Sequence, residues 1–359
     1  MATIKNATLY LWIYTGEFGV KPTDPNYVLY KEVKTGSDLI TFEVSELIRD
    51  YIDVVFTGDY FNVIESVWAE WTMVQVYDDN TTVDVVGEVI AFNSYGYFKD
   101  GVNPALTVGA LYTNDNIYNY AGQPIYFPVM TGGDAAFQAS YYDGNTLIRT
   151  DTFGTSIQSI TADSNIYTVD STTITADAGF ITGSSSQLVQ RVQLPSNTTK
   201  VEVVLNNNTT ETKYIKTIEE CKYAPNKISF LNRYGIVQDL WFFKRKDESV
   251  NIQKNNYLEN TLTETNNIVS YSLNDASNIP SNFKVTKGLK LNTGFVTEDH
   301  NQVIQELLLT ERAWIHENSN VFPIIPKTTS LQYKTSLNDN LINFTVDFDY
   351  AYNEINLIK

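Results

Sequence analysis

Ile342-Asn-Phe344-Thr-Val346-Asp-Phe348-Asp-Tyr350, near the end of the chain, places an apolar residue at every second position. Because successive side chains of a strand point to opposite faces, this period of two predicts an antiparallel strand with one buried and one solvated face. A second alternating run, Leu331–Thr335, comes shortly before it, and residues 336–340 supply turn-forming side chains. We therefore expect the C-terminal region to form strands at the edges of sheets, without a catalytic loop.

Similar alternation recurs towards the N-terminus. Leu9, Leu11 and Ile13 share one face of a predicted strand, and aromatic residues occupy the other face. Turn residues at 78–80 and 143–144 separate β-branched runs and predict two hairpins. Only two segments have helical spacing: a short one within 41–51, and a longer one that follows a capping residue at Thr297 or Asp299.

These patterns predict an all-β protein of several antiparallel modules, sandwich-like or barrel-like, with one or two short helices. We divide the chain into an N-terminal β-rich domain (1–130), a β-sandwich-like insertion module (131–225) and a C-terminal β-rich domain with one helix (226–359). The first and third domains are expected to pack together. Residues 251–282 are rich in Asn and weakly patterned, and no element is predicted there.

The composition excludes several classes of function. The 359 residues include 42 acidic and 25 basic side chains, and the net charge of -17 argues against a general patch for nucleic acid. The apolar run at residues 9–14 is too short for a membrane span and lacks a signal cleavage region, so we expect a product made in the cytoplasm. With Cys221 as the single cysteine, no intrachain disulfide can form.

The residues that usually carry catalysis are scarce. The chain has two histidines, His300 and His316, which are too few for a histidine metal centre, and no Gly-X-Ser-X-Gly turn or phosphate-binding loop is present. We assign His300 a surface or capping role. We therefore predict no catalytic residues, no cofactor and no metal, with calcium bound by a loop as an open alternative. A pair of carboxylates in an aromatic groove would suit glycoside hydrolysis, but no pair stands out.

Consecutive aromatic residues predict where subunits meet. Trp241, Phe242 and Phe243 project to both faces of one strand, so at least one ring needs a second cover. Trp314 and Phe322 pose the same problem beside the predicted helix. We expect these five side chains to be buried partly by a neighbouring subunit or by another layer of the same protein. The alternative is a two-sided core within one chain, with the insertion module as the cover.

The C-terminal domain resembles a known class of proteins. Residues 228–235, 238–243 and 291–295, and the stretch from 334 to 352, resemble motifs in virion structural proteins of tailed bacteriophages, most closely the crAss-like phages and related phages of Bacteroidetes. The likeness covers mainly residues 227–359 and carries no catalytic residues over. In such phages, β-rich proteins of this kind build the tail barrel, its rings and the hub.

The resemblance implies a non-enzymatic subunit of a homo-oligomeric ring or collar, located in the virion tail and assembled in the host cytoplasm. Stacking beneath the portal would imply twelve copies, with the portal and other tail ring or hub proteins as neighbours. Two alternatives stay open. One is a receptor-binding or fibre-attachment protein, expected to be a trimer, and the other is a polysaccharide depolymerase of the tail.

Overall fold

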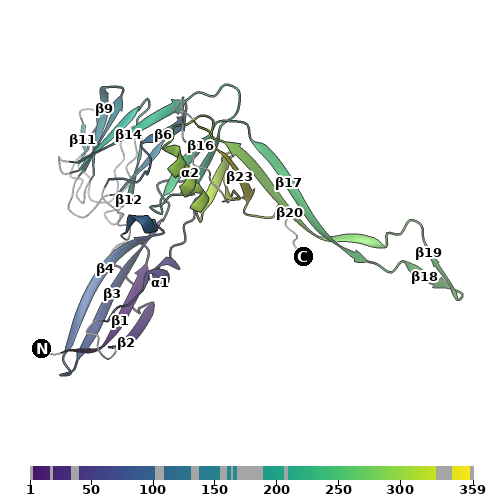
Figure 1. Ribbon diagram of the computed structural model, residues 1–359, viewed down its shortest axis with the longest axis horizontal. Coiled ribbons are helices and arrows are strands. Elements are labelled where there is room, and N and C mark those ends of the chain that lie inside the picture. Colours follow the sequence, from purple (N-terminus) through teal and green to yellow (C-terminus); the bar gives the residue numbers. More distant parts are fainter. Residues whose placement is uncertain are drawn as a thin grey trace.

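The computed structural model describes residues 3–16, 19–33, 40–101, 109–130, 137–153, 160–162, 165–167, 189–205, 209–328 and 342–355. In these residues most of the regular structure is strand, in mainly antiparallel sheets, with two α-helices. The predicted all-β class is confirmed. The strand order of every described sheet is open, so this part of the chain forms no closed barrel. Figure 1 shows a body from which two β structures project in different directions.

The N-terminal sheet is one of these projections. It has the order β2-β1-β3-β4 and is formed by β1 (Ile4–Tyr14), β2 (Tyr27–Glu32), β3 (Ser66–Tyr77) and β4 (Thr82–Phe92). The hairpin predicted at residues 78–80 joins β3 to β4, and Asn80 adopts the positive φ that its turn requires. On one face, Leu11 and Ile13 pack against Ile48 of helix α1 (Ser45–Arg49), which confirms the first predicted helix.

Two sheets face each other in the middle of the chain. One is β12 (Val189–Gln193), β7 (Tyr126–Met130) and β5 (Gly109–Ala110); the other is β6 (Asn116–Tyr120), β14 (Thr209–Ile218), β13 (Lys200–Leu205), β8 (Phe137–Asp143) and β9 (Thr146–Phe153). Phe127, Tyr141 and Val203 contribute to the buried core that they share. This sandwich takes strands from both sides of residue 130, because β7 pairs with β12 and β6 pairs with β14. A separate pair, β10 (Ile160–Ala162) and β11 (Asn165–Tyr167), completes the region.

The C-terminal sheet has seven strands. In spatial order these are β16 (Val237–Phe242), β15 (Asn226–Leu231), β21 (Ala313–Glu317), β22 (Asn320–Pro326), β23 (Thr345–Tyr350), β20 (Asn278–Asn292) and β17 (Asp247–Leu258). Helix α2 (His300–Leu309) contributes Val303, Ile304 and Leu307 to the core on one face of the sheet. The second predicted helix is therefore confirmed. Asp299 stands at its N-cap position, but the carboxylate accepts hydrogen bonds from Asn116 and does not cap the helix.

The alternating strand near the C-terminus is β23. Its residues Val346, Phe348 and Tyr350 are buried, whereas Asp347 and Asp349 are half-buried, as the period of two predicts. Its position was predicted wrongly, because β23 lies inside the sheet between β22 and β20 and not at an edge. The strand expected at residues 331–335 lies outside the described residues.

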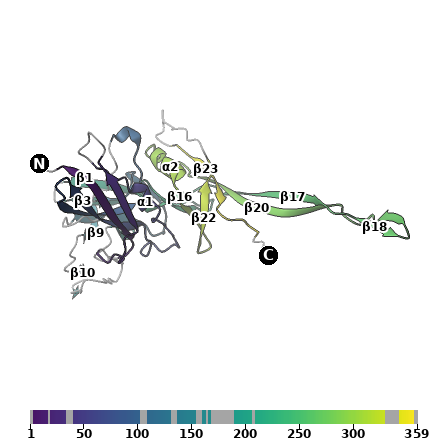
Figure 2. The same ribbon diagram turned by 90° about the horizontal axis from the view of Figure 1, so that it is seen from below.

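The second projection is a hairpin formed by β17 and β20. Beyond Val250 and Lys287, which face each other, β20 pairs only with β17 and no longer with β23. The ribbon runs outward to a small tip formed by β18 (Leu262–Thr265) and β19 (Ile268–Tyr271), as Figures 1 and 2 both show. We call residues 250–287 the hairpin arm. No element was predicted for this long hairpin, because its sequence is Asn-rich and weakly patterned.

A buried ion pair connects the three parts of the chain. Arg191 of β12 donates to Glu65, which precedes β3, and both side chains are almost fully buried. The same Glu65 oxygen accepts the backbone N–H of Val237 in β16 at 2.6 Å. A single carboxylate thus contacts the sandwich and the C-terminal sheet from the end of the N-terminal sheet.

Candidate interaction surface

The five aromatic residues predicted at a subunit interface lie largely inside the chain. Trp241, Phe242, Phe243 and Trp314 are all buried, and Phe242 has no exposed surface. Phe322 is half-buried, with its ring 6.2 Å from that of Tyr352. Four of these rings therefore need no neighbouring subunit to cover them.

The chain itself supplies the covers. The Trp241 ring lies 5.7 Å from Tyr120 of the sandwich strand β6. The Phe242 ring meets Phe348 edge-on at 6.0 Å inside the C-terminal core. Trp314, on the opposite face, lies 5.5 Å from Phe56 in the segment between α1 and β3. Aromatic residues on both faces of β16 and β21 are thus explained by a core on each face of the same sheet.

A polar cluster beside Trp314 contains Ser, His and Asp but lacks the geometry of a catalytic triad. Ser229 Oγ lies 2.7 Å from His316 Nε2 and donates to Asp239 at 2.5 Å. In a triad the histidine stands between the serine and the carboxylate, whereas here Asp239 contacts the serine directly. Ser229 is also fully buried, so a substrate has no access to its hydroxyl.

This cluster instead ties the segment after α1 to the C-terminal sheet. The Tyr60 hydroxyl donates to Asp239 at 2.7 Å and accepts from Lys227 at 3.0 Å. Burial, assisted by the nearby Lys227 charge, lowers the pKa of His316 to about 4. A neutral imidazole suits this position, since its Nε2–H can donate to Ser229 Oγ, whose own proton goes to Asp239, without adding a second cation.

His300 is buried and not on the surface, which corrects the role assigned to it from the sequence. Its ring packs edge-on against Tyr118 at 5.1 Å, and neither ring nitrogen has a hydrogen-bond partner. Burial lowers its pKa to about 4, an effect that the neighbouring Asp299 only partly offsets. The helix begins with a neutral, apolar contact at this position.

His300 makes stability depend on pH. Its pKa is lower in the folded than in the unfolded state, so stability is complete above the unfolded pKa of about 6.5 and falls as pH drops towards 4. Between pH 7 and pH 4 we expect the wild type to lose about 2–3 kcal/mol more than His300→Phe does. Urea unfolding of both proteins across this range measures the difference. Parallel pH curves would contradict the assignment, whatever the substitution itself does to stability at pH 7.

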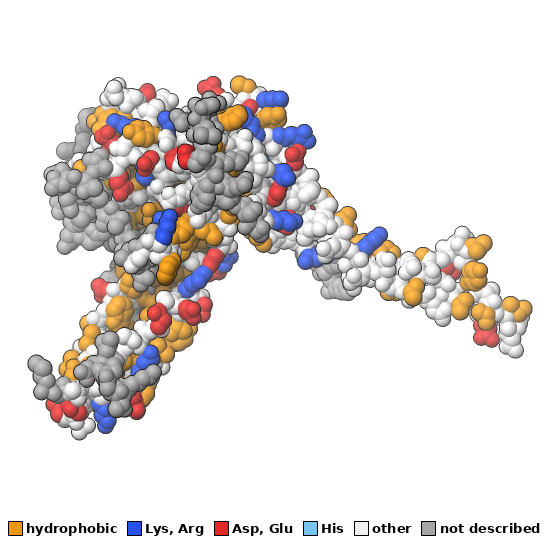
Figure 3. All heavy atoms as spheres, in the orientation of Figure 1, with side chains coloured by type: hydrophobic (Ala, Val, Ile, Leu, Met, Phe, Trp, Pro, Cys, Tyr) orange, Lys and Arg blue, Asp and Glu red, His pale blue; other side chains and the backbone are white. Residues whose placement is uncertain are grey.

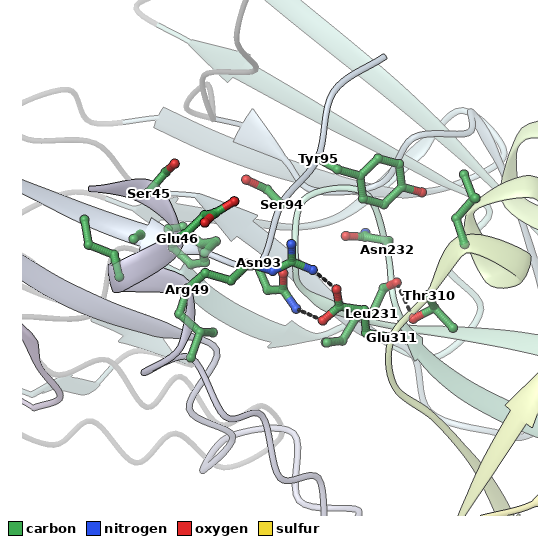
Figure 4. Close-up of a pocket in the computed structure, with 15 residues that line it drawn as sticks. Ser45, Glu46, Arg49, Asn93, Ser94, Tyr95, Leu231, Asn232, Thr310 and Glu311 are labelled. Carbon is green, nitrogen blue, oxygen red and sulfur yellow. Dashed lines mark hydrogen bonds and ion pairs between the residues drawn. The ribbon is translucent and has the colours of Figure 1, made fainter. Parts of the chain in front are cut away.

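One pocket lies at the junction of the N-terminal sheet and the body. Its volume is about 680 Å³, and it is lined by α1, the end of β4 and the residues after α2. Figure 4 shows Glu311 between Arg49, which donates to one of its oxygens, and Asn93, which donates to the other at 2.8 Å. Because both Glu311 oxygens are engaged, this carboxylate does not form a free acid–base pair with Glu46.

Other features of a functional centre are missing from the described residues. They contain no group of three or more His, Cys, Asp or Glu side chains arranged to hold a metal ion. None of their helices has the length and apolar character needed to cross a membrane. The most unusual feature of this part of the chain is its exposed apolar surface.

The hairpin arm carries much of that surface. Every residue of β17, β18 and β19 is exposed, including Leu258 at 79% and Ile268 at 69%. Leu273, near the tip, is 91% exposed. Hydrophobic side chains are visible along the arm and at its end in Figure 3. Exposed apolar patches larger than a few hundred square ångströms usually mark interaction sites.

The N-terminal sheet carries a second exposed apolar surface, on the face opposite α1. Tyr10 lies between Val28 of β2 and Thr72 of β3, and Thr72 lies beside Val86 of β4. Val28 and Val86 are exposed, the latter at 73%. Tyr30, in the neighbouring row, is also exposed. We call this surface the outer face of the N-terminal sheet.

Sequence reasoning missed both surfaces. The valines of β4 and the alternation in β1 predicted strands, but the absence of a second layer over one face depends on where other elements lie. The arm was missed because its Asn-rich sequence has no hydrophobic period, and such a period is what identifies the inward face of a strand. No protein-family model, curated protein or solved structure matches the chain.

Proposed function

We propose that this chain is a non-enzymatic structural subunit that assembles with copies of itself into a ring or collar of a phage tail. The phage assignment is supported by the resemblance of residues 227–359 to virion structural proteins. The multi-copy assignment has a separate basis in the exposed surfaces of the molecule.

The observation that carries the proposal is the hairpin arm. A two-stranded hairpin is marginally stable in water unless a third strand or another layer packs against it. The arm has 38 residues, with exposed apolar side chains along β17 and at its tip. A single ribbon of this length exposes apolar surface that another molecule can cover.

The charge of the arm also suits an interface. Among these 38 residues only six are charged: Lys254, Glu259, Glu264, Asp275, Lys284 and Lys287. Depletion of charge is typical of the buried centre of protein interfaces. Strand β17 is at the edge of the sheet, and an exposed edge invites pairing with another chain.

The mass of the native assembly tests this proposal. We expect the wild type to form a closed oligomer in native mass spectrometry, with twelve copies if the resemblance extends to stacking beneath the portal. A trimer would favour the receptor-binding or fibre-attachment alternative. A monomer that cleaves a polysaccharide would favour the depolymerase and defeat the structural role.

An arm-deleted variant gives the test a matched control. Gln253 and Lys284 face each other across the hairpin, so an Asn-Gly turn can join them in place of residues 254–283. We expect this variant to keep the far-ultraviolet circular dichroism and the thermal unfolding of the body, because the deletion removes none of its buried core. It should sediment as a monomer. Assembly equal to that of the wild type would show that the arm has no part in it.

A further inference from the structure

We propose that the hairpin arm of one copy packs on the outer face of the N-terminal sheet of the next copy. This inference rests on the proposed multi-copy assembly and identifies its contact. It commits to a second copy of this chain as the occupant of the outer face.

Both surfaces are single β layers, and each has an apolar face that no second layer of the described chain covers. The inner face of the N-terminal sheet packs against α1, while Tyr30 and Val86 on the outer face remain exposed. The arm is a two-stranded ribbon with exposed apolar residues such as Val250 and Ile252. A sheet becomes stable in water when another layer covers its apolar face, and two such layers pack face to face about 10 Å apart.

The lengths of the two surfaces agree. Strand β17 has 12 residues, and β3 and β4 have 12 and 11. At about 3.3 Å per residue, β3 and β4 are therefore about 35–40 Å long, and the nine residues of β17 that belong to the arm (250–258) span about 30 Å before the tip begins. The arm can lie along the sheet over most of its length.

The charges of the two surfaces are complementary. Lys254 shares the face of the arm that carries Val250 and Ile252, and it forms no ion pair with another described residue. Asp84 and Glu88 of β4, which share the outer face with Val86, form none with the described residues either. Packing of this face across β4 would bring an unpaired cation to two unpaired anions, and complementary charge fixes the register of an interface.

The contact must be made between copies. Figures 1 and 2 show the arm and the N-terminal sheet extending from the body in different directions, so the arm of one chain cannot reach its own sheet without unfolding. A contact between two different surfaces is heterologous, and its repetition closes into a ring when the rotation between copies allows. The inferred contact thus agrees with the proposed assembly.

Charge reversal tests the contact through its specificity. Lys254→Glu and Asp84→Lys/Glu88→Lys should each weaken association by about 100-fold, because like charges would then face each other. The triple variant should recover association to within about 10-fold of the wild type, which surface damage alone would not produce. Equal loss in the triple variant and in the two charge reversals made separately would overturn the inference.

Mixing provides a second and independent measurement. The arm-deleted variant retains an intact outer face, and Asp84→Lys/Glu88→Lys retains an intact arm. Each should be monomeric alone, and the mixture should stop at a one-to-one complex, since only one contact can form. If the face variant assembles like the wild type, the arm binds elsewhere and the inference fails while the multi-copy assembly stands. If the wild type itself is a monomer, the proposed function fails as well.

Discussion

Phe242→Ser is expected to lower the free energy of unfolding by about 4–5 kcal/mol. Phe242 is fully buried against Phe348 in the core beneath α2, and truncation of a buried phenylalanine leaves a cavity that its neighbours fill only partly. The serine hydroxyl adds a buried polar group among apolar side chains. Urea unfolding monitored by tryptophan fluorescence measures the change.

Phe322→Ser is the matched control for this prediction. Phe322 lies in the same sheet but is only half-buried, so its loss should cost about 1–2 kcal/mol. At temperatures where Phe242→Ser is still folded, we expect the Phe242→Ser protein to assemble like the wild type. Loss of assembly with an unchanged free energy of unfolding would instead place Phe242 at a subunit interface, as the sequence suggested.

Glu65→Ala is expected to lower the free energy of unfolding by about 3–5 kcal/mol. The substitution leaves the Arg191 guanidinium buried without its partner, and a buried unpaired charge is among the most costly single defects. It also removes the acceptor of the Val237 N–H. Since Glu65 connects three parts of the chain, we expect their unfolding to become less cooperative.

The double variant Glu65→Gln/Arg191→Met separates charge from connectivity. The glutamine oxygen can still accept the Val237 N–H, and methionine occupies the space of the arginine stem without a charge. We expect it to be more stable than Glu65→Gln alone, which leaves the arginine unpaired. Equal stability of the two would show that the buried charge of Arg191 is not the source of the loss.

Local patterns were sufficient to predict the elements that have one buried and one solvated face. The period of two over residues 342–350 predicted β23, and the helical spacing after Thr297 or Asp299 predicted α2. Turn residues located the hairpins at 78–80 and 143–144. These successes share a cause, because each pattern follows from which way neighbouring side chains point along one element.

The same patterns failed where neighbours along the sheet or in another layer decide the outcome. The aromatic residues of β16 and β21 predicted an interface, but Phe56 and Tyr120, from distant parts of the chain, cover them. For the arm, the error was the opposite one, because no element was predicted where a long hairpin forms. A ribbon with no inward face has no hydrophobic period to detect.

By itself, the sequence determined the β class, the two helices and the local strand patterns, because alternation and turn chemistry act between residues close in the chain. Only the tertiary structure decided which apolar faces are covered. It buried Phe242 and Trp314 inside one chain and left Val86 and Leu258 exposed. The physical reason is that burial depends on a second layer, and long-range packing alone determines which segment supplies that layer.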